Sequence, residues 1–317
     1  MLAYLIWNRM AGQRDVQRPL EEAMEVLTAG GWTVRMVETI RQGDGTRLAR
    51  RAVEEGAQVA IAAGGDGTVN ELVNGLVGSN TALGVLPVGT GNVWAKELGL
   101  PGWVPPYRHA LREAAQGLLD SGIRTVDVGR ANGRYFLLWA GVGFDAEVAH
   151  EVEPLWEMRR RLGNLLYAVS SLSLALSFVG TRSTVVVDGR SSRQRVVLVL
   201  ISNVQLYGGG LLRVAPTAHL DDGSLDVYVF RGRGGAAAFH HFFSVLAQYH
   251  VRDPQIRYYR ARRVEVHTDR PMAVQVDGEA YGQSPLRVEV APRALKILVP
   301  PTAPDTIFQS PSVHYAR

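Results

Sequence analysis

The chain has 317 residues, of which 46% are hydrophobic and 20% charged, and its formal net charge is +4. This composition is that of a globular protein and argues against a disordered chain or a polytopic membrane protein. The length predicts two domains, because single cores stop growing at about 250 to 300 residues. There is no cysteine, which excludes disulfides, thiolate nucleophiles and cysteine-based zinc sites.

The first part of the chain alternates strand-like and helix-like segments. Strands are predicted at 2–7, 33–38, 59–63 and 82–86, and helices at 16–29, 45–55 and 68–76. Such alternation predicts βαβ units on a parallel sheet. The apolar run at the N-terminus is too short for a signal peptide and has no basic leader, so we expect a first strand and a cytoplasmic protein.

Two glycine-rich loops, 64–67 and 87–92, each follow an apolar strand and precede a helix. Both should emerge at the carboxyl edge of the sheet, where open α/β folds bind ligands. Glycines let phosphate oxygens approach backbone N–H groups, and the helix start adds unpaired donors. Asp66 would repel a phosphate unless Mg²⁺ lies between them or the carboxylate manages a proton. The first loop is therefore predicted to handle phosphate, with a tight structural turn as the alternative.

Four side chains around these loops have local interpretations. Thr68 and Glu71 match the Ser/Thr-x-x-Glu capping box of a helix start. Thr90 offers a hydroxyl that can reach a phosphate, and Asn92 is predicted to cap the helix that follows the second loop.

After about residue 123 the sequence becomes rich in strands and turns. Strands are predicted at 125–128, 135–140, 184–187, 196–201, 225–230, 264–267, 272–276 and 286–290. This pattern predicts a mostly antiparallel second domain. The expected division is an α/β domain at 1–123 and a β-rich domain at 124–292, with 293–317 packing back on the first.

A helical insert is predicted at 151–179, where three arginines precede an apolar stretch. The stretch is shorter than a membrane span and contains serines, so we interpret it as a core helix or as an amphipathic helix that meets lipid. Farther on, His240 and His241 are adjacent and cannot share one helix face as a zinc pair would, so they are interpreted as ordinary helix residues. An arginine and tyrosine cluster at 257–263 is interpreted as a solvated or headgroup-facing surface rather than a nucleic-acid site.

Three motifs of the second part carry chemistry: Tyr-Gly-Gly-Gly at 207–210, Asp-Asp-Gly-Ser at 221–224 and Val-Gln-Val-Asp-Gly-Glu at 274–279. The last places Asp277 and Glu279 beside a glycine at a strand end. One of these two carboxylates could accept a proton from an alcohol.

The order of these motifs resembles the diacylglycerol kinase catalytic-domain family, which contains bacterial lipid kinases and sphingosine and ceramide kinases. GGDGTVNEL, LPVGTGN, GVGFDAEV, YGGG, APTAHLDDGSLDV and VQVDGE follow one another over nearly the whole chain. GGDGT alone is shared with NAD kinases; the downstream motifs are specific. The resemblance implies a Rossmann-like parallel sheet of NAD-kinase and diacylglycerol-kinase type, followed by a mostly antiparallel, β-sandwich-like domain.

The resemblance also assigns roles to residues. It implies that ATP is bound by Asn8, Thr39, Gly64, Gly65, Asp66, Gly67, Thr68, Asn70, Thr90 and Gly91. Asp66 would also act in catalysis by organising Mg²⁺, with Asp127 in the surrounding water network. Glu279 matches the family's general base, and Asp277 stands beside it as a second catalytic candidate. A structural metal site would be formed by Asp222 with the backbone carbonyls of His219 and Ser224.

Two positions depart from the family pattern. Asn8 is followed by Arg9, where the family has proline, and Asn92 is followed by Val93, where it often has aspartate. The second change removes one acidic partner from the metal network.

The resemblance implies an ATP- and Mg²⁺-dependent kinase that transfers the γ-phosphate to a lipid hydroxyl of diacylglycerol, a related glycerolipid or a sphingoid base. Its partner would be lipid presented by a membrane surface, not nucleic acid, so the cytoplasmic chain could be peripheral at the inner membrane face. A sheet edge in the second domain is compatible with a homodimer. Two other hypotheses are an NAD kinase-like enzyme for a small molecule and a non-catalytic nucleotide or lipid sensor.

Overall fold

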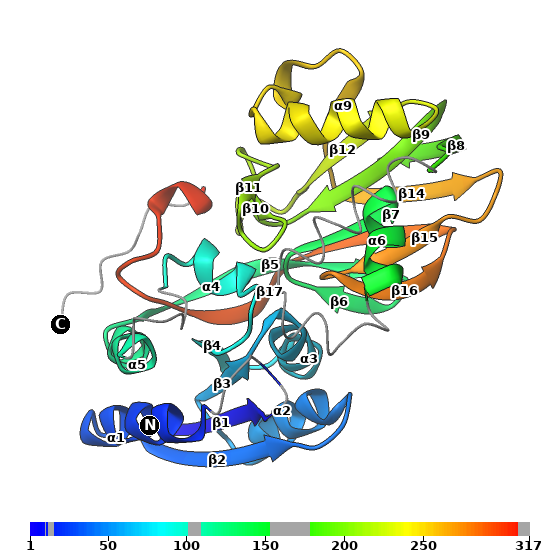
Figure 1. Ribbon diagram of the computed structural model, residues 1–317. Helices are drawn as coiled ribbons and strands as arrows, with labels where there is room; N and C mark the ends of the chain where they lie inside the picture. Colours follow the sequence, from blue (N-terminus) through cyan, green and yellow to red (C-terminus); the bar gives the residue numbers. More distant parts are fainter. Residues whose placement is uncertain (10, 12–15, 101–108, 153–177, 310–317) are drawn as a thin grey trace. The chain divides into compact units, whose positions relative to one another are not determined.

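The computed structural model describes residues 1–9, 11, 16–100, 109–152 and 178–309, and these form two compact units (Figure 1). The first unit contains Met1–Asp127, Leu220–Asp222 and the chain from Pro292 on; the second contains Val128–His219 and Gly223–Ala291. Most of the predicted insert at 151–179 lies outside the described residues.

The first unit is built on a parallel sheet with the strand order β17-β4-β3-β1-β2. All residues of β3 and β4 are buried, as expected of strands covered on both faces. Helix α1 packs against α5, and α2 packs against α3 (Figure 1). The elements are β1 (Leu2–Asn8), α1 (Gln17–Ala29), β2 (Thr33–Thr39), α2 (Asp44–Glu54), β3 (Val59–Gly64), α3 (Asp66–Leu76), β4 (Ala82–Pro87), α4 (Val93–Glu97), α5 (Ala110–Leu119) and η3 (Asp305–Ile307).

The second unit is antiparallel, with the strand order β16-β15-β7-β9-β8-β14-β17 and with β12 pairing both β9 and β13. Its core consists mainly of valine, leucine and isoleucine side chains from these strands. Strands β5 and β17 contribute residues to both units. The elements are β5 (Gly122–Ala131), β6 (Arg134–Phe136), β7 (Trp139–Gly143), α6 (Phe144–Val152), β8 (Thr181–Val187), β9 (Arg190–Ser202), β10 (Leu206–Tyr207), β11 (Leu212–Arg213), β12 (Leu225–Arg231), α9 (Gly235–Leu246), η2 (His250–Arg252), β13 (Ile256–Ala261), β14 (Arg263–Thr268), β15 (Ala273–Val276), β16 (Glu279–Gln283) and β17 (Leu286–Val299).

The predicted fold class is confirmed, because parallel strands of the N-terminal region are followed by an antiparallel, sandwich-like domain. Some local predictions were wrong. The single strand expected at 135–140 is two strands, β6 and β7, because the N–H groups between them donate to the Asp277 carboxylate. Strands β13 and β16 were not expected at all.

Residues 300–309 form a short ordered segment on the first unit. Ile307 and Phe308 are buried there, and the backbone N–H of Leu220 donates to the Ile307 carbonyl at 2.8 Å. The Arg124 guanidinium lies 4.1 Å from the centre of the Phe308 ring. Among the described residues, no helix has the length and apolar character that crossing a membrane requires.

Candidate functional site

The carboxyl ends of β1, β2, β3 and β4 meet at one edge of the first unit's parallel sheet. Asn8 at the end of β1 pairs with Thr39 at the end of β2, and Gly64 at the end of β3 pairs with Pro87 at the end of β4; β1 and β3 are also parallel neighbours. The two glycine loops therefore emerge beside Asn8 and Thr39. The structure thus gathers at this edge the residues to which a nucleotide-binding role was assigned.

The two glycine loops touch through their backbones. A Cβ atom added at Gly89 would lie 2.4 Å from the Gly65 Cα atom, and one added at Gly64 would lie 2.2 Å from the Thr68 hydroxyl oxygen. The N–H groups of Val88 and Gly89 both donate to the Gly64 carbonyl at 3.3 Å. Glycine is required at these positions because no side chain fits, and the contact fixes one loop against the other.

Asp66 begins α3 and links the first loop to the helix that follows the second. Its carboxylate accepts the backbone N–H groups of Val93 and Trp94, each at 3.1 Å, and so caps the N-terminus of α4. The prediction that Asn92 caps this helix was wrong: Asn92 occupies the N-cap position, but its amide group donates to the Gly89 carbonyl at 2.7 Å. These two N–H groups fix the Asp66 carboxylate beside the two glycine loops.

Lys96 on α4 is a residue that the sequence interpretation missed. Burial lowers the pKa of Lys96, and the negative charge of nearby Asp66 opposes this shift. Because Lys96 interacts with Asp66, its amino group lies close to the glycine loops. When protonated, it would add a charged hydrogen-bond donor for a phosphate there. The signal in the sequence was that this chain has only two lysines and places one of them in the helix after the second glycine loop.

The exposed and buried members of the predicted ATP site differ in what they can contact. Thr90 is exposed, and Gly65, Asp66 and Gly67 are partly exposed. Thr68 and Asn70 are buried, and their side chains bond within the protein: the Thr68 hydroxyl accepts the Asn8 amide at 3.4 Å, and the Asn70 side-chain oxygen accepts the Asn74 amide at 3.3 Å. Thr68 and Asn70 therefore stabilise the first glycine loop from the buried side. Gly91 lies beside Asp66, since a Cβ added there would be 3.0 Å from the Asp66 Oδ2 atom.

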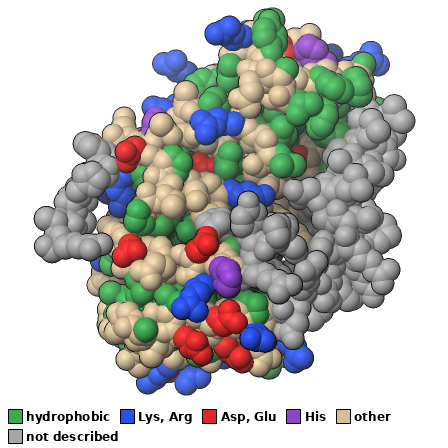
Figure 2. All heavy atoms as spheres, turned by 60° about the vertical axis from the view of Figure 1, so that its left-hand side comes forward, with side chains coloured by type: hydrophobic (Ala, Val, Ile, Leu, Met, Phe, Trp, Pro, Cys, Tyr) green, Lys and Arg blue, Asp and Glu red, His purple; other side chains and the backbone are tan. Residues whose placement is uncertain are grey.

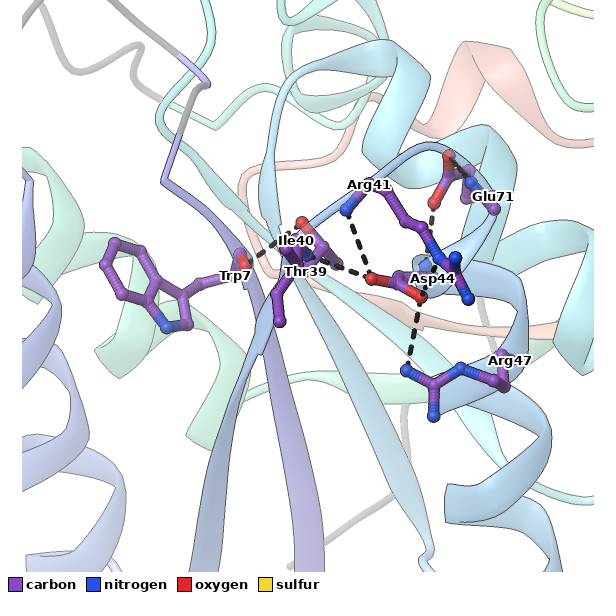
Figure 3. Close-up of polar contacts among 9 residues, drawn as sticks. Trp7, Thr39, Ile40, Arg41, Asp44, Arg47 and Glu71 are labelled. Carbon is purple, nitrogen blue, oxygen red and sulfur yellow. Dashed lines mark hydrogen bonds and ion pairs between the residues drawn. The ribbon is translucent and has the colours of Figure 1, made fainter.

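The turn after Thr39 is held by Asp44 (Figure 3). The Thr39 hydroxyl donates to the Trp7 carbonyl at 3.4 Å. The Asp44 carboxylate accepts the backbone N–H groups of Ile40 at 3.0 Å and Arg41 at 3.1 Å, and these bonds hold the pKa of Asp44 below its usual value. Asp44 thus fixes the backbone that follows the carboxyl end of β2.

Glu71 braces the same turn from α3. Its two carboxylate oxygens accept the N–H groups of Gly43 and Gly45, both at 2.7 Å, and its backbone carbonyl accepts the Thr46 hydroxyl at 2.8 Å. The predicted capping box of Thr68 and Glu71 was therefore wrong. Helix α3 begins at Asp66 with no side-chain cap, and Glu71 serves the start of α2 instead.

The edge also offers oxygen atoms that suit Mg²⁺. The Asn92 side-chain oxygen is buried and has no hydrogen-bond partner among the described residues, and the Asp66 carboxylate lies beside the same loop, next to Gly91 and the Val93 N–H group. Amide and carboxylate oxygens are ligands that Mg²⁺ accepts. Asp127 is fully buried, and its Oδ1 atom accepts the Arg293 N–H at 2.7 Å. The Asp66 and Asn92 oxygens are thus chemically suited to a hard divalent cation.

His219, Asp222 and Ser224 lie in the loop that precedes β12. One oxygen of the Asp222 carboxylate is buried, and the neighbouring Asp221 carboxylate accepts the Gln309 N–H at 2.6 Å. The role of this loop in binding a structural metal stays a prediction.

In the second unit, the Asp-Gly-Glu motif forms a tight hairpin between β15 and β16. Asp277 has a positive φ of 51°, and its carboxylate accepts the N–H groups of Leu137, Leu138 and Trp139 at 2.9–3.1 Å. Three backbone donors leave this carboxylate a positioning role. Of the two carboxylates named from the sequence, Asp277 is buried and Glu279 is partly exposed.

Glu279 is paired with Arg134, the second residue that the sequence interpretation missed. The Arg134 guanidinium donates to the Glu279 Oε2 atom at 2.5 Å, and it also stacks over the Tyr281 ring at 5.7 Å. Because Arg134 lies 145 positions away in the chain, no local pattern could reveal the pair. The pair fixes the direction of the Glu279 carboxylate.

A buried carboxyl group connects three motifs of the second unit. The Asp145 Oδ2 atom accepts the Tyr207 hydroxyl and the Gln275 amide, both at 2.9 Å. Burial raises the pKa of Asp145 to about 6, and these two hydrogen bonds oppose the rise. Gly141 leaves room for this contact, since a Cβ there would lie 2.5 Å from the Asp145 Oδ2 atom. The Gln275 side-chain oxygen in turn accepts the Gly278 N–H at 2.9 Å. Asp145 is thus linked to the hairpin that carries Glu279.

Taken separately, the first unit is an α/β fold with two glycine loops at the carboxyl edge of its sheet, and the second is an antiparallel fold in which Glu279 is partly exposed. Comparison with known proteins agrees with this class. Residues 2–131 match the diacylglycerol kinase catalytic domain, and residues 139–299 match the YegS C-terminal NAD kinase beta sandwich-like domain.

Several similar proteins are named diacylglycerol kinase. The diacylglycerol kinase of Bacillus subtilis is 30% identical over 285 residues, which cover 89% of this chain and 91% of that protein. The diacylglycerol kinase of Staphylococcus carnosus is 26% identical over 307 residues, or 96% and 97% of the two chains. A crystal structure of a diacylglycerol kinase from Bacillus anthracis superposes with a TM-score of 0.77 at 26% identity and covers 95% of this chain and 98% of that one. The chain belongs to the diacylglycerol kinase family, as the order of its motifs predicted.

Proposed function

We propose that this protein is an ATP- and Mg²⁺-dependent kinase that phosphorylates the hydroxyl group of diacylglycerol or a related lipid. Its relatives are diacylglycerol kinases over nearly their full length, which supports kinase activity at the level of the family. The observation that carries the proposal is the contact between two glycine loops at the start of α3, with the Asp66 carboxylate beside them. This arrangement offers backbone N–H groups and a helix N-terminus to a phosphate chain.

The nucleotide half of the reaction falls to the first unit. The Gly64–Gly67 backbone would hold the phosphates, with Thr90 and Lys96 adding a hydroxyl and an ammonium donor. Asn8 and Thr39 lie at the neighbouring strand ends, where the nucleoside would contact them. Asp66 and the Asn92 side-chain oxygen would hold Mg²⁺, which when bound neutralises charge on the transferred phosphoryl group.

The acceptor half falls to the second unit. The lipid hydroxyl oxygen forms a bond to the γ-phosphorus while the bond from that phosphorus to the β,γ-bridging oxygen breaks, and ADP leaves with the electron pair. The hydroxyl proton passes to the Glu279 carboxylate, which Arg134 holds in direction. Positioning and charge neutralisation would supply most of the acceleration, as in other phosphoryl transfers.

The experiment is a phosphate-transfer screen with radiolabelled ATP. Purified protein is offered diacylglycerol, other glycerolipids, sphingosine, NAD and soluble alcohols, with Mg²⁺ and with a chelator. We expect label in a glycerolipid or sphingoid base, and only when Mg²⁺ is present. Label in NAD without any lipid dispersion would instead support the small-molecule kinase, and ATP binding without transfer to any acceptor would support the sensor.

A further inference from the structure

Helix α9 shows its large apolar side chains to solvent. Phe239, Phe242, Phe243 and Leu246 are 48%, 44%, 47% and 53% exposed. Their spacing of three, four and seven positions places them on one face of the helix, and we call this set the aromatic stripe. The Phe243 ring contacts both other rings, with centroids 4.5 Å from that of Phe239 and 5.5 Å from that of Phe242.

The opposite face of α9 is buried although it is smaller and more polar than the stripe. It carries Ala238, His241, Ser244 and Val245. The His241 Nε2 atom bonds to the Arg231 carbonyl at 2.7 Å. A surface helix normally buries its largest apolar residues. In α9 the arrangement is reversed, because the large apolar side chains are exposed and the smaller, more polar ones are buried. Its polar anchors fix this orientation, and the aromatic stripe therefore cannot be explained as part of the core.

The preceding residue of the helix, His240, adds a second anchor. His240 Nε2 bonds to the Asp253 carboxylate at 2.7 Å, and the Ser244 hydroxyl donates to the same carboxylate oxygen at 3.4 Å. Among the described residues, His240, His241 and Asp253 form one group close enough to hold a metal. Both histidines nevertheless use Nε2 for bonds within the protein, in agreement with their interpretation as ordinary helix residues. These bonds hold α9 against the second unit.

The surroundings of the aromatic stripe are basic. The sequence from Arg231 to Arg252 contains no aspartate or glutamate. Exposed Arg233 precedes the helix, exposed Arg252 follows it, and Tyr249 beyond the C-terminus is 54% exposed. Figure 2 shows hydrophobic side chains gathered at the top of the molecule, where α9 lies, with Lys and Arg side chains around them. The patch thus combines aromatic surface with positive charge.

We propose that the aromatic stripe of α9 docks the protein onto the surface of an anionic lipid bilayer. Phenylalanine and leucine on one helix face, with arginines at the ends and no acids, match the chemistry of helices that lie in the headgroup region. With 12 residues, α9 is about 18 Å long, too short to cross a membrane but long enough to lie flat on it. The inference rests on the proposed function, because a lipid kinase must meet its substrate at such a surface.

The first test is co-sedimentation with vesicles of phosphatidylcholine alone and of phosphatidylcholine mixed with phosphatidylglycerol. Wild type should bind the anionic vesicles more strongly. The double variant Phe242→Ser, Phe243→Ser should bind at least about tenfold more weakly, because two rings leave the lipid contact. Ile123→Ser, at an exposed apolar position 43% accessible on β5, is the matched control and should bind like wild type. Arg233→Glu tests the charge separately and should reduce the preference for anionic vesicles.

A second measurement separates docking from catalysis. Phosphorylation of a short-chain diacylglycerol dissolved as monomers should be unchanged in the double variant, while phosphorylation of the same lipid class in vesicles should fall with binding. Vesicle binding by wild type without any lipid phosphorylation would refute the proposed function and leave docking intact. Vesicle binding equal in wild type and the double variant would overturn the docking proposal. It would also be overturned if the variant changed only the oligomeric state in gel filtration, since the stripe would then join copies of this chain.

Discussion

Replacing Asp145 by asparagine should change how the stability of the protein depends on pH. The Asp145 carboxyl is buried and accepts hydrogen bonds from Tyr207 and Gln275. Burial raises its pKa from 3.8 to about 6 in the folded state. Between these two values the unfolded chain has lost the proton and the folded chain still holds it. Stability therefore falls as the pH rises through this window and is flat above it.

The magnitude follows from the size of the shift. A pKa difference of about two units corresponds to about 3 kcal/mol of folding free energy between about pH 4 and pH 7. Asparagine is uncharged at every pH and its oxygen can accept the same two hydrogen bonds, so Asp145→Asn removes this dependence. The variant should gain on wild type steadily as the pH rises to about 6.

The assay is urea unfolding of wild type and Asp145→Asn at several pH values from about 4 to about 8. Tyr207→Phe serves as a comparison, since it removes one hydrogen bond to the carboxyl but leaves the titrating group in place. The reasoning would be refuted if the difference in unfolding free energy between wild type and Asp145→Asn were the same at all pH values.

Three further substitutions test other contacts. Gly89→Ala forces the two glycine loops apart and should lower kcat/KM by about a hundredfold, whereas Gly117→Ala in α5, where a Cβ meets only ordinary contacts at 3.7 Å, should be neutral in the same assay. Glu71→Gln replaces one of two acceptor oxygens at the start of α2 and should raise the KM for ATP while costing about 1–2 kcal/mol in thermal unfolding; an unchanged KM would contradict its bracing role. Asp277→Asn sets an amide N–H against a backbone N–H and should cost about 1–3 kcal/mol of stability by denaturant titration, so a variant as stable as wild type would contradict the positioning role.

The sequence was sufficient for the family and for the fold class. Each glycine loop follows an apolar strand and precedes a helix, and parallel strands bring their carboxyl ends to one edge. The convergence of Asn8, Thr39 and the two loops could therefore be anticipated from spacing. Whether these residues bind ATP stays a prediction.

The supporting contacts could not be predicted, because they join residues that no local pattern relates. The carboxylate of Glu71 reaches amides 26 and 28 positions earlier, where a capping box would have kept it within its own helix. The carboxylate of Asp277 takes its partners from 138 to 140 positions away and so interrupts a strand that the apolar pattern alone would have continued. In the sequence, Asp145 is one residue of the GVGFDAEV motif. Only the structure shows that its side chain contacts Tyr207 and Gln275, which belong to two other motifs.

The central claim is that Asp66 helps to bind the nucleotide with its Mg²⁺ and that Glu279 accepts the proton of a lipid hydroxyl. The most direct measurement is ATP affinity and lipid phosphorylation side by side for Glu279→Gln, with Glu289→Gln as the control, since Glu289 is also paired with an arginine on the second unit but is 48% exposed. The account predicts that Glu279→Gln binds ATP like wild type and loses about a hundredfold or more in turnover, while the control keeps both. Turnover of Glu279→Gln within a few fold of wild type would contradict it.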